Sequence, residues 1–195
     1  LTGVPMHFLH LSTARSVELV RAAKADGLAV TAEAAPHHFS LTDECLAGFD
    51  PVFKVNPPLR EPADIAAIKA GLADGTIDAI ATDHAPHAPH TKELPLDQAP
   101  PGMIGLETAL GLCLAALSWK PAAIAGVAHR HGRPLVPGEP ANITVFDPQL
   151  EWQVAPGAMA SKSRNTPYVG RLLRGRVRHT VYAGAPVVVD GVARR

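Results

Sequence analysis

Cysteine, net charge and long apolar runs are scarce or absent in this sequence, and each absence excludes a class of protein. Cys45 and Cys113 are the only cysteines in 195 residues, which excludes a disulfide framework and the short cysteine spacings of a structural zinc site. We expect both to be reduced, buried thiols in a cytoplasmic protein. No stretch reaches the ~18 consecutive apolar residues that a membrane-spanning helix requires, so we expect no association with the membrane.

The charges balance, with 18 Lys and Arg against 18 Asp and Glu. This balance excludes the basic surface typical of nucleic-acid and acidic-membrane binding. Hydrophobic residues make up 47% of the chain and charged residues 18%, which predicts a folded protein of one domain or a domain and a half. The chain begins Leu1-Thr2-Gly3, without an initiator Met or a signal-peptide layout, so we expect it to be an inner part of a longer chain.

Strand and helix patterns alternate through the first part of the chain. Strands are expected over residues 6–11, 28–34 and 75–80, with a brief extended run over 52–55. Helices are expected between a Ser12 or Thr13 cap and Asp26-Gly27, from Thr42, over Pro62 to Ala73, over Gly105 to Leu117 on the barrel, and over Pro121 to His129. This alternation predicts an α/β fold with parallel strands and right-handed crossovers.

The pattern changes near residue 133. A Pro- and Gly-rich linker is expected over 134–140, and short β-type runs follow over 143–146, 151–154, 175–182 and 187–189. Turn pairs such as Asp147-Pro148 and Asp190-Gly191 separate these runs and predict hairpins. We therefore predict two domains, an α/β part over residues 1–133 and a small β-sandwich-like module over 134–195.

The segment Ala81-Thr82-Asp83-His84-Ala85-Pro86-His87 carries the strongest chemical signal. Asp83 follows a short buried strand, and the loops after parallel strands build the active sites of α/β barrels. A carboxylate with two imidazoles within four residues can hold a metal ion and move a proton. The long, proline-rich segment over 84–103 is predicted to be a loop that covers a substrate.

Several segments together resemble the C-terminal half of the class I dihydroorotases, within the amidohydrolase superfamily. They are His10-Leu11-Ser12-Thr13, Thr31 to His38, Lys54 to Arg60, Ala81 to His87, Gly102 to Thr108 and Ser161 to Gly170. The resemblance covers essentially the whole chain. Single motifs are shared with hydantoinases and allantoinases, but the combination of residues 55–60 with residues 82–87 is closer to dihydroorotase.

The resemblance implies a partial (β/α)8 barrel, its last strands and helices, followed by the small β-module. Family members hold two zinc ions at the barrel mouth, and His10 and Asp83 match two of the metal ligands. Asp83 also matches the residue that accepts a proton from the attacking hydroxide and passes it to the leaving nitrogen. A neutral imidazole and a carboxylate are both good zinc ligands.

The resemblance also implies the substrate contacts. Asn56 and His87 match side chains that bind the substrate, and Pro101 and Gly102 match a backbone segment that touches its ring. Histidines 37 and 38 are interpreted as supporting or structural residues rather than ligands. A structural role is also expected for Glu33, Arg60 and Glu107, and no role is assigned to His84 or His90.

The family's remaining metal ligands do not occur in this chain, and two ligands cannot close a tetrahedral site. We therefore expect a fragment that is inactive alone, from a zinc-dependent enzyme that interconverts dihydroorotate and N-carbamoyl-L-aspartate in pyrimidine synthesis. The alternatives are an allantoinase or hydantoinase, and a non-catalytic scaffold for aspartate transcarbamoylase. The expected partners are a small-molecule substrate, copies of the same chain in a homo-oligomer and aspartate transcarbamoylase.

Overall fold

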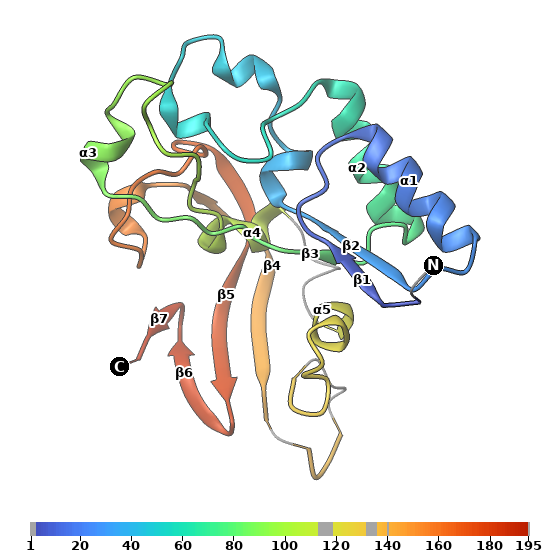
Figure 1. Cartoon of the computed structure of the whole chain (residues 1–195). Coiled ribbons are helices and arrows are strands. Elements are labelled where there is room, and N and C mark those ends of the chain that lie inside the picture. The colour runs from blue at the N-terminus through green and yellow to red at the C-terminus, as the bar shows by residue number, and fades with distance from the viewer. Residues whose placement is uncertain (1–2, 113–118, 132–135, 140, 195) are drawn as a thin grey trace.

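The chain folds into a three-stranded parallel sheet and a four-stranded antiparallel sheet in a computed structural model. The structure describes residues 3–112, 119–131, 136–139 and 141–194. In Figure 1 the parallel strands and their helices lie on one side, and the long strands of the antiparallel sheet run away from them. The expected α/β fold, with parallel strands first and a small sheet second, is confirmed.

The parallel sheet has the order β1-β2-β3, with β1 over Met6–Phe8, β2 over Val30–Ala34 and β3 over Ala79–Ile80. His7 pairs with Thr31 and Glu33 pairs with Ala79. All three strands are shorter than the apolar runs that predicted them. β1 ends before Leu11 because the backbone at His10 has φ +51°, which no strand residue adopts.

Two helices cover this sheet, α1 over Ala14–Ala25 and α2 over Pro62–Asp74. The predicted Thr13 cap is present, with its hydroxyl accepting from the Ser16 amide at 3.1 Å, and Gly75 in the left-handed region ends α2. The helices and strands enclose one apolar core. Its buried residues are Leu11, Val17, Val20, Ala32, Ala34, Phe39, Ile68, Ile77 and Ile80.

Three short 3₁₀ helices connect β2 to α2, namely η1 over Pro36–Phe39, η2 over Asp43–Leu46 and η3 over Pro51–Phe53. The prediction of an extended run over residues 52–55 is wrong in its first half. The Asp50 carboxylate accepts from the Val52 amide at 2.9 Å, and Pro51 has the φ of a first helical residue. This local cap turns the chain into η3 before it can extend.

The 84–103 segment contains one short helix, α3 over Pro89–Lys92, and leads to α4 over Leu106–Leu112 and α5 over Trp119–Ile124. The predicted helix over 105–117 therefore begins as expected, and its end lies outside the described residues. Helix α4 packs against strand β5 of the antiparallel sheet, whereas α5 contacts β3. The structure shows α4 against the antiparallel sheet, and packing of this helix on the barrel stays a prediction.

The antiparallel sheet is a meander of β4 over Ile143–Gln153, β5 over Leu172–Tyr182, β6 over Ala185–Val189 and β7 over Val192–Ala193. The hairpin expected at Asp147-Pro148 is instead an irregularity within β4. Its cause is the Asp147 carboxylate, which accepts from the Gln149 and Leu150 amides at 2.9 and 3.2 Å. The hairpin expected at Asp190-Gly191 is present, with both residues at positive φ.

A second apolar core joins the loops after the parallel strands to the antiparallel sheet. Its buried residues are Leu41, Val55, Leu59, Met103, Ile104, Val154, Met159, Tyr168 and Leu173. The predicted boundary at residues 133–134 and part of the 134–140 linker lie outside the described residues, so the two-domain division stays a prediction. The described residues after it form a single sheet, and a sandwich-like partner layer also stays a prediction.

Cys45 is a free thiol that is only partly buried, where full burial was predicted, and Cys113 lies outside the described residues. None of the helices in the described part of the chain has the length and apolar character that a membrane crossing requires.

Replacement of Ile68 by Ala tests the first core. Ile68 is fully buried on α2, so loss of its side chain should lower the free energy of unfolding by about 2–5 kcal/mol. Thermal unfolding followed by circular dichroism measures the change. The matched control is Lys69→Ala at the next, exposed position, which should change stability by less than about 0.5 kcal/mol. Equal stability of the two variants would contradict this packing.

Candidate metal centre and substrate loop

Three side chains gather where the parallel strands end. His10 follows β1, His37 follows β2 and Asp83 follows β3, and the carboxyl ends of parallel strands lie at one edge of a sheet. His10 Nε2 lies 3.7 Å from Asp83 Oδ1, and His37 Nε2 lies 3.8 Å from Asp83 Oδ2. The structure therefore brings together the two predicted metal ligands, with one imidazole on each side of the carboxylate.

The backbone at both predicted ligands is in the left-handed region. The φ angle is +51° at His10 and +46° at Asp83, a conformation that few residues other than glycine adopt. Strained non-glycine residues persist where the surrounding structure fixes them, and they are concentrated at functional sites. Both residues lie within three positions of a strand end, at Phe8 for β1 and at Ile80 for β3.

Glu33 lies behind His10, at the end of β2. Its side chain is largely buried, with Oε2 at 3.2 Å from His7 Nε2 and Oε1 at 2.9 Å from His10 Nδ1. The contact with His10 is off the axis of a hydrogen bond, so Nδ1 remains a buried ring nitrogen without a hydrogen-bonded partner. A carboxylate beside one ring nitrogen is the usual support of a histidine that binds metal through the other. Sequence reasoning treated Glu33 as structural and missed this contact.

His37 and His38 are buried together in η1, with ring centroids 4.3 Å apart. Burial lowers the pKa of His37 to about 3, with contributions from the neighbouring His38 and His10 imidazoles. Burial also lowers the pKa of His38, whose Nε2–H donates to the Pro57 carbonyl at 2.8 Å. Both rings are therefore neutral at neutral pH.

The donors present fit part of a zinc site. Two ligands of a tetrahedral zinc ion, each about 2.0–2.2 Å from the metal, lie roughly 3.3–3.6 Å apart, close to the 3.7 Å between His10 Nε2 and Asp83 Oδ1. Within the described ranges, no group of three or more His, Cys, Asp or Glu side chains is arranged to hold a metal ion. This part of the chain thus offers two well-placed ligands and no closed site.

The predicted substrate contacts lie on two neighbouring loops. The His87 ring packs against the backbone of the 101–102 segment, with Nε2 at 3.1 Å from the Pro101 carbonyl oxygen. The Gly102 amide donates to the Lys54 carbonyl at 2.8 Å, which places this segment beside the Asn56 loop. Asn56 itself is exposed, and its side chain makes no hydrogen bond with another described residue. The amide of Asn56 is therefore available to a ligand.

The 84–103 loop is held in place by residues that sequence reasoning did not select. The His87 amide donates to Ser163 Oγ at 2.9 Å, and Asn165 Nδ2 donates to the Ala85 carbonyl at 2.9 Å. Within the loop itself, Lys92 Nζ donates to the Gly102 carbonyl at 2.9 Å. The only sequence signal for Ser163 and Asn165 was their place in the Ser161 to Gly170 motif, which predicted no role for either residue.

The residues expected to be structural hold loops by specific contacts. Arg60 donates to Ser12 Oγ at 3.3 Å, and the Glu107 carboxylate accepts from the Ala160 and Ser161 amides. His84, to which no role was assigned, accepts through Nδ1 from the Gly105 amide at 3.2 Å. These contacts position the loops around the sheet edge.

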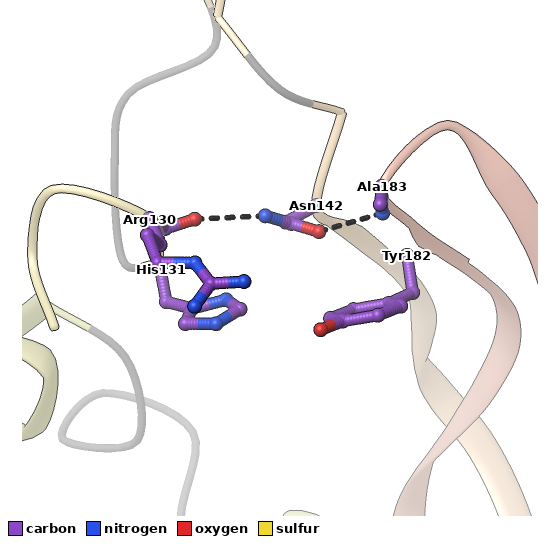
Figure 2. Close-up of a pocket in the computed structure, with 5 residues that line it drawn as sticks. All are labelled: Arg130, His131, Asn142, Tyr182 and Ala183. Atoms are coloured by element: carbon purple, nitrogen blue, oxygen red, sulfur yellow. Dashed lines mark hydrogen bonds between the residues drawn. The ribbon is translucent and has the colours of Figure 1, made fainter.

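A separate cavity of about 220 Å³ lies by the turn after β5. Figure 2 shows His131 facing Tyr182 across it, with Asn142 bridging the Arg130 carbonyl and the Ala183 amide. No predicted site residue lines it. Because the Asn142 amide is already paired on both sides, we interpret it as a link between the Arg130 backbone and this turn.

Replacement of Gly102 by Ala tests the packing of the substrate loop. A Cβ at this position would lie 2.6 Å from His87 Nε2, and φ is +133°, so the variant should lose about 1–3 kcal/mol of stability. Thermal unfolding measures the loss. Gly48→Ala is the matched control, since a Cβ there meets nothing within 4 Å. Similar unfolding temperatures for the two variants would contradict the close contact between Gly102 and His87.

Comparisons with known proteins agree with this architecture. The chain is 50% identical to a dihydroorotase of Streptomyces coelicolor over 97% of its own length and 47% of the relative's. It is 49% identical to a dihydroorotase of Pelotomaculum thermopropionicum, over 99% and 48%. It is 47% identical to one of Mycobacterium leprae, over 93% and 46%. No family model matches the chain.

Solved structures give the same picture. The L-hydantoinase of Arthrobacter aurescens superimposes with a TM-score of 0.91 at 26% identity, over 99% of this chain and 47% of the neighbour. A D-hydantoinase of Thermus sp. superimposes with a TM-score of 0.88 at 24% identity, over 99% and 46%. The predicted partial (β/α)8 barrel is confirmed by these likenesses. The chain spans about half the length of the curated relatives it matches, and over that half it is similar in sequence to dihydroorotases and in structure to a hydantoinase.

Proposed function

We propose that this chain is the C-terminal part of a zinc-dependent cyclic amide hydrolase that interconverts dihydroorotate and N-carbamoyl-L-aspartate. The observation that carries the proposal is the approach of His10 Nε2 to Asp83 Oδ1, at 3.7 Å, from the ends of two different strands. Relatives with 50% and 49% sequence identity are named dihydroorotases, which supports dihydroorotate as the substrate. The test is hydrolysis of dihydroorotate by the complete enzyme.

By the complete enzyme we mean this chain together with the preceding half of the barrel, either its own or that of the Streptomyces coelicolor relative. Strand β1 lies at the edge of the parallel sheet, and Met6 and Leu9 near that edge are 58% and 64% exposed. Open, apolar sheet edges are a liability that proteins cover. These features support further strands beside β1, which would supply the remaining metal ligands. The chain alone is expected to be inactive.

His10 and Asp83 would hold the metal, through Nε2 and Oδ1 respectively. A zinc ion in such a site lowers the pKa of bound water toward neutrality and polarises the attacked carbonyl. Asp83 Oδ2, which lies on the side of His37 at 3.8 Å from its Nε2, would take the proton of the attacking water. The same oxygen returns this proton to the ring nitrogen as the carbon–nitrogen bond breaks, so the carboxylate ends as it began.

The neighbouring loops would bind the substrate. Dihydroorotate has a carboxylate, ring amides and a nearly planar ring, and the Asn56 amide and the His87 imidazole offer matching hydrogen bonds. Gly102 lets the backbone after Pro101 approach the ring closely. The proposal thus includes two zinc ions as the cofactor and substrate contacts at Asn56, His87, Pro101 and Gly102.

Two other functions are distinguishable from this one. The likeness to the Arthrobacter L-hydantoinase favours a hydantoinase or allantoinase as the second candidate, and parallel assays with hydantoin and allantoin would separate it. A non-catalytic scaffold for aspartate transcarbamoylase would need no zinc ligands, and the convergence of His10 and Asp83 argues against it. The complete enzyme is proposed to be a cytoplasmic homo-oligomer, with aspartate transcarbamoylase as a candidate partner.

Replacement of Asp83 by Ala in the complete enzyme should abolish hydrolysis while the fold persists. Loss of the proton-transferring group should lower kcat by about 10²–10⁴-fold, measured from the rate of dihydroorotate consumption. The control is Asp97→Ala, an exposed position on the same loop, which should keep full activity. Near-normal turnover of the Asp83 variant with zinc bound would contradict the proton-transfer role.

Replacement of His87 by Ala should weaken substrate binding and leave zinc binding intact. A hydrogen bond to a charged group is worth about 1.5–3 kcal/mol, so KM should rise at least tenfold at unchanged zinc content. Steady-state kinetics and metal analysis measure the two effects. The control is His90→Ala, at an exposed position of the same loop. Loss of zinc with an unchanged KM would overturn the assignment.

A further inference from the structure

We infer that His37 is a positioning residue for the Asp83 carboxylate. The inference rests on the proposed function, in which Asp83 binds metal through one oxygen and moves a proton through the other. His37 Nε2 is buried without a hydrogen-bonded partner and lies 3.8 Å from Asp83 Oδ2. A buried N–H or ring nitrogen without a partner is costly, and Oδ2 is the acceptor that it faces.

The His37 ring is rigidly held. The whole residue is 2% exposed, and its ring packs edge-on against His38 at a centroid distance of 4.3 Å. His38 is fixed in turn by its bond to the Pro57 carbonyl, next to Asn56. A continuous set of buried groups thus runs from the proposed substrate loop to Asp83.

The imidazole of His37 suits this role by its position. An N–H at Nε2 can donate one hydrogen bond to the carboxylate oxygen that it faces. Its N–H completes a hydrogen bond if the Asp83 carboxylate turns slightly to close the gap between 3.8 Å and the usual 2.7–3.2 Å. A carboxylate oxygen has two lone pairs, so Oδ2 can accept from His37 and still receive the transferred proton.

The consequence is that each carboxylate oxygen keeps one role, with Oδ1 binding the metal and Oδ2 transferring the proton. Asp83 itself has a left-handed backbone conformation, and His10 Nε2 lies 3.7 Å from its Oδ1. Without a donor at Oδ2, the carboxylate could rotate about its own axis and exchange the two oxygens. His37 prevents that exchange by its contact on the opposite side.

The test compares three variants of the complete enzyme, His37→Leu, His37→Gln and Phe39→Leu. The Leu variant removes the donor, the Gln variant restores an N–H near the Nε2 position, and Phe39 is a buried apolar residue of the same 3₁₀ helix. The measurements are zinc affinity by competition with a chelator, kcat, KM and thermal unfolding. Loss of a residue that orients a ligand typically lowers metal affinity or activity by about 10–100-fold.

We expect His37→Leu to lower kcat and zinc affinity at least tenfold, with KM within about twofold of the parent value. His37→Gln should recover most of the lost kcat and zinc affinity. Phe39→Leu should change stability alone. Parental zinc affinity and kcat in His37→Leu would overturn the inference. Equal losses in all three variants would also overturn it, because they indicate a merely structural role. If the parent binds zinc without hydrolysing dihydroorotate, the proposed substrate is wrong and zinc affinity still decides the role of His37. A parent that binds no zinc would overturn both.

Discussion

The structure depends on one geometric constraint, that an imidazole after β1 and a carboxylate after β3 point at the same place across the intervening strand β2. A parallel sheet brings the strand ends to one edge, but strands side by side direct their chain ends along the sheet rather than toward each other. Both His10 and Asp83 have a left-handed backbone conformation, and their Nε2 and Oδ1 atoms lie 3.7 Å apart.

Buried polar side chains lie against both proposed ligands, His10 and Asp83. Glu33 extends from the middle strand to both His7 and His10, and His37 lies beside the far oxygen of Asp83. Glu33 lies in β2, which is the central strand of the sheet, and His37 lies in η1, directly after that strand. The central strand therefore carries the supports, while the two outer strands carry the proposed ligands.

The antiparallel sheet takes part in the site through its connections rather than its strands. The excursion between β4 and β5 returns to the loop after β3, where Ser163 and Asn165 bond to the backbone of residues 85–87. The second core seals this junction with apolar side chains from both parts. The L- and D-hydantoinases that this chain resembles have the same fold over this half, so a fold alone does not set the substrate. We therefore propose that substrate choice resides in the proposed loop contacts at Asn56, His87 and the 101–102 backbone.

The sequence by itself determined the parallel strands and their helices, because apolar periodicity and caps such as Thr13 and Gly75 act over a few residues. It also predicted Asp83 as a site residue from its motif after a buried strand, and His10 as a metal ligand from the resemblance to dihydroorotases. The sequence did not predict the 3₁₀ turn at Pro51 or the irregularity at Asp147, because each depends on how one carboxylate contacts backbone amides. It also did not predict that α4 packs against β5, because β5 lies far away in the chain. The roles of Glu33, His37, Ser163 and Asn165 were decided by tertiary structure alone. Their partners lie 23 to 80 positions away in the chain, and no local pattern encodes which buried polar groups will meet.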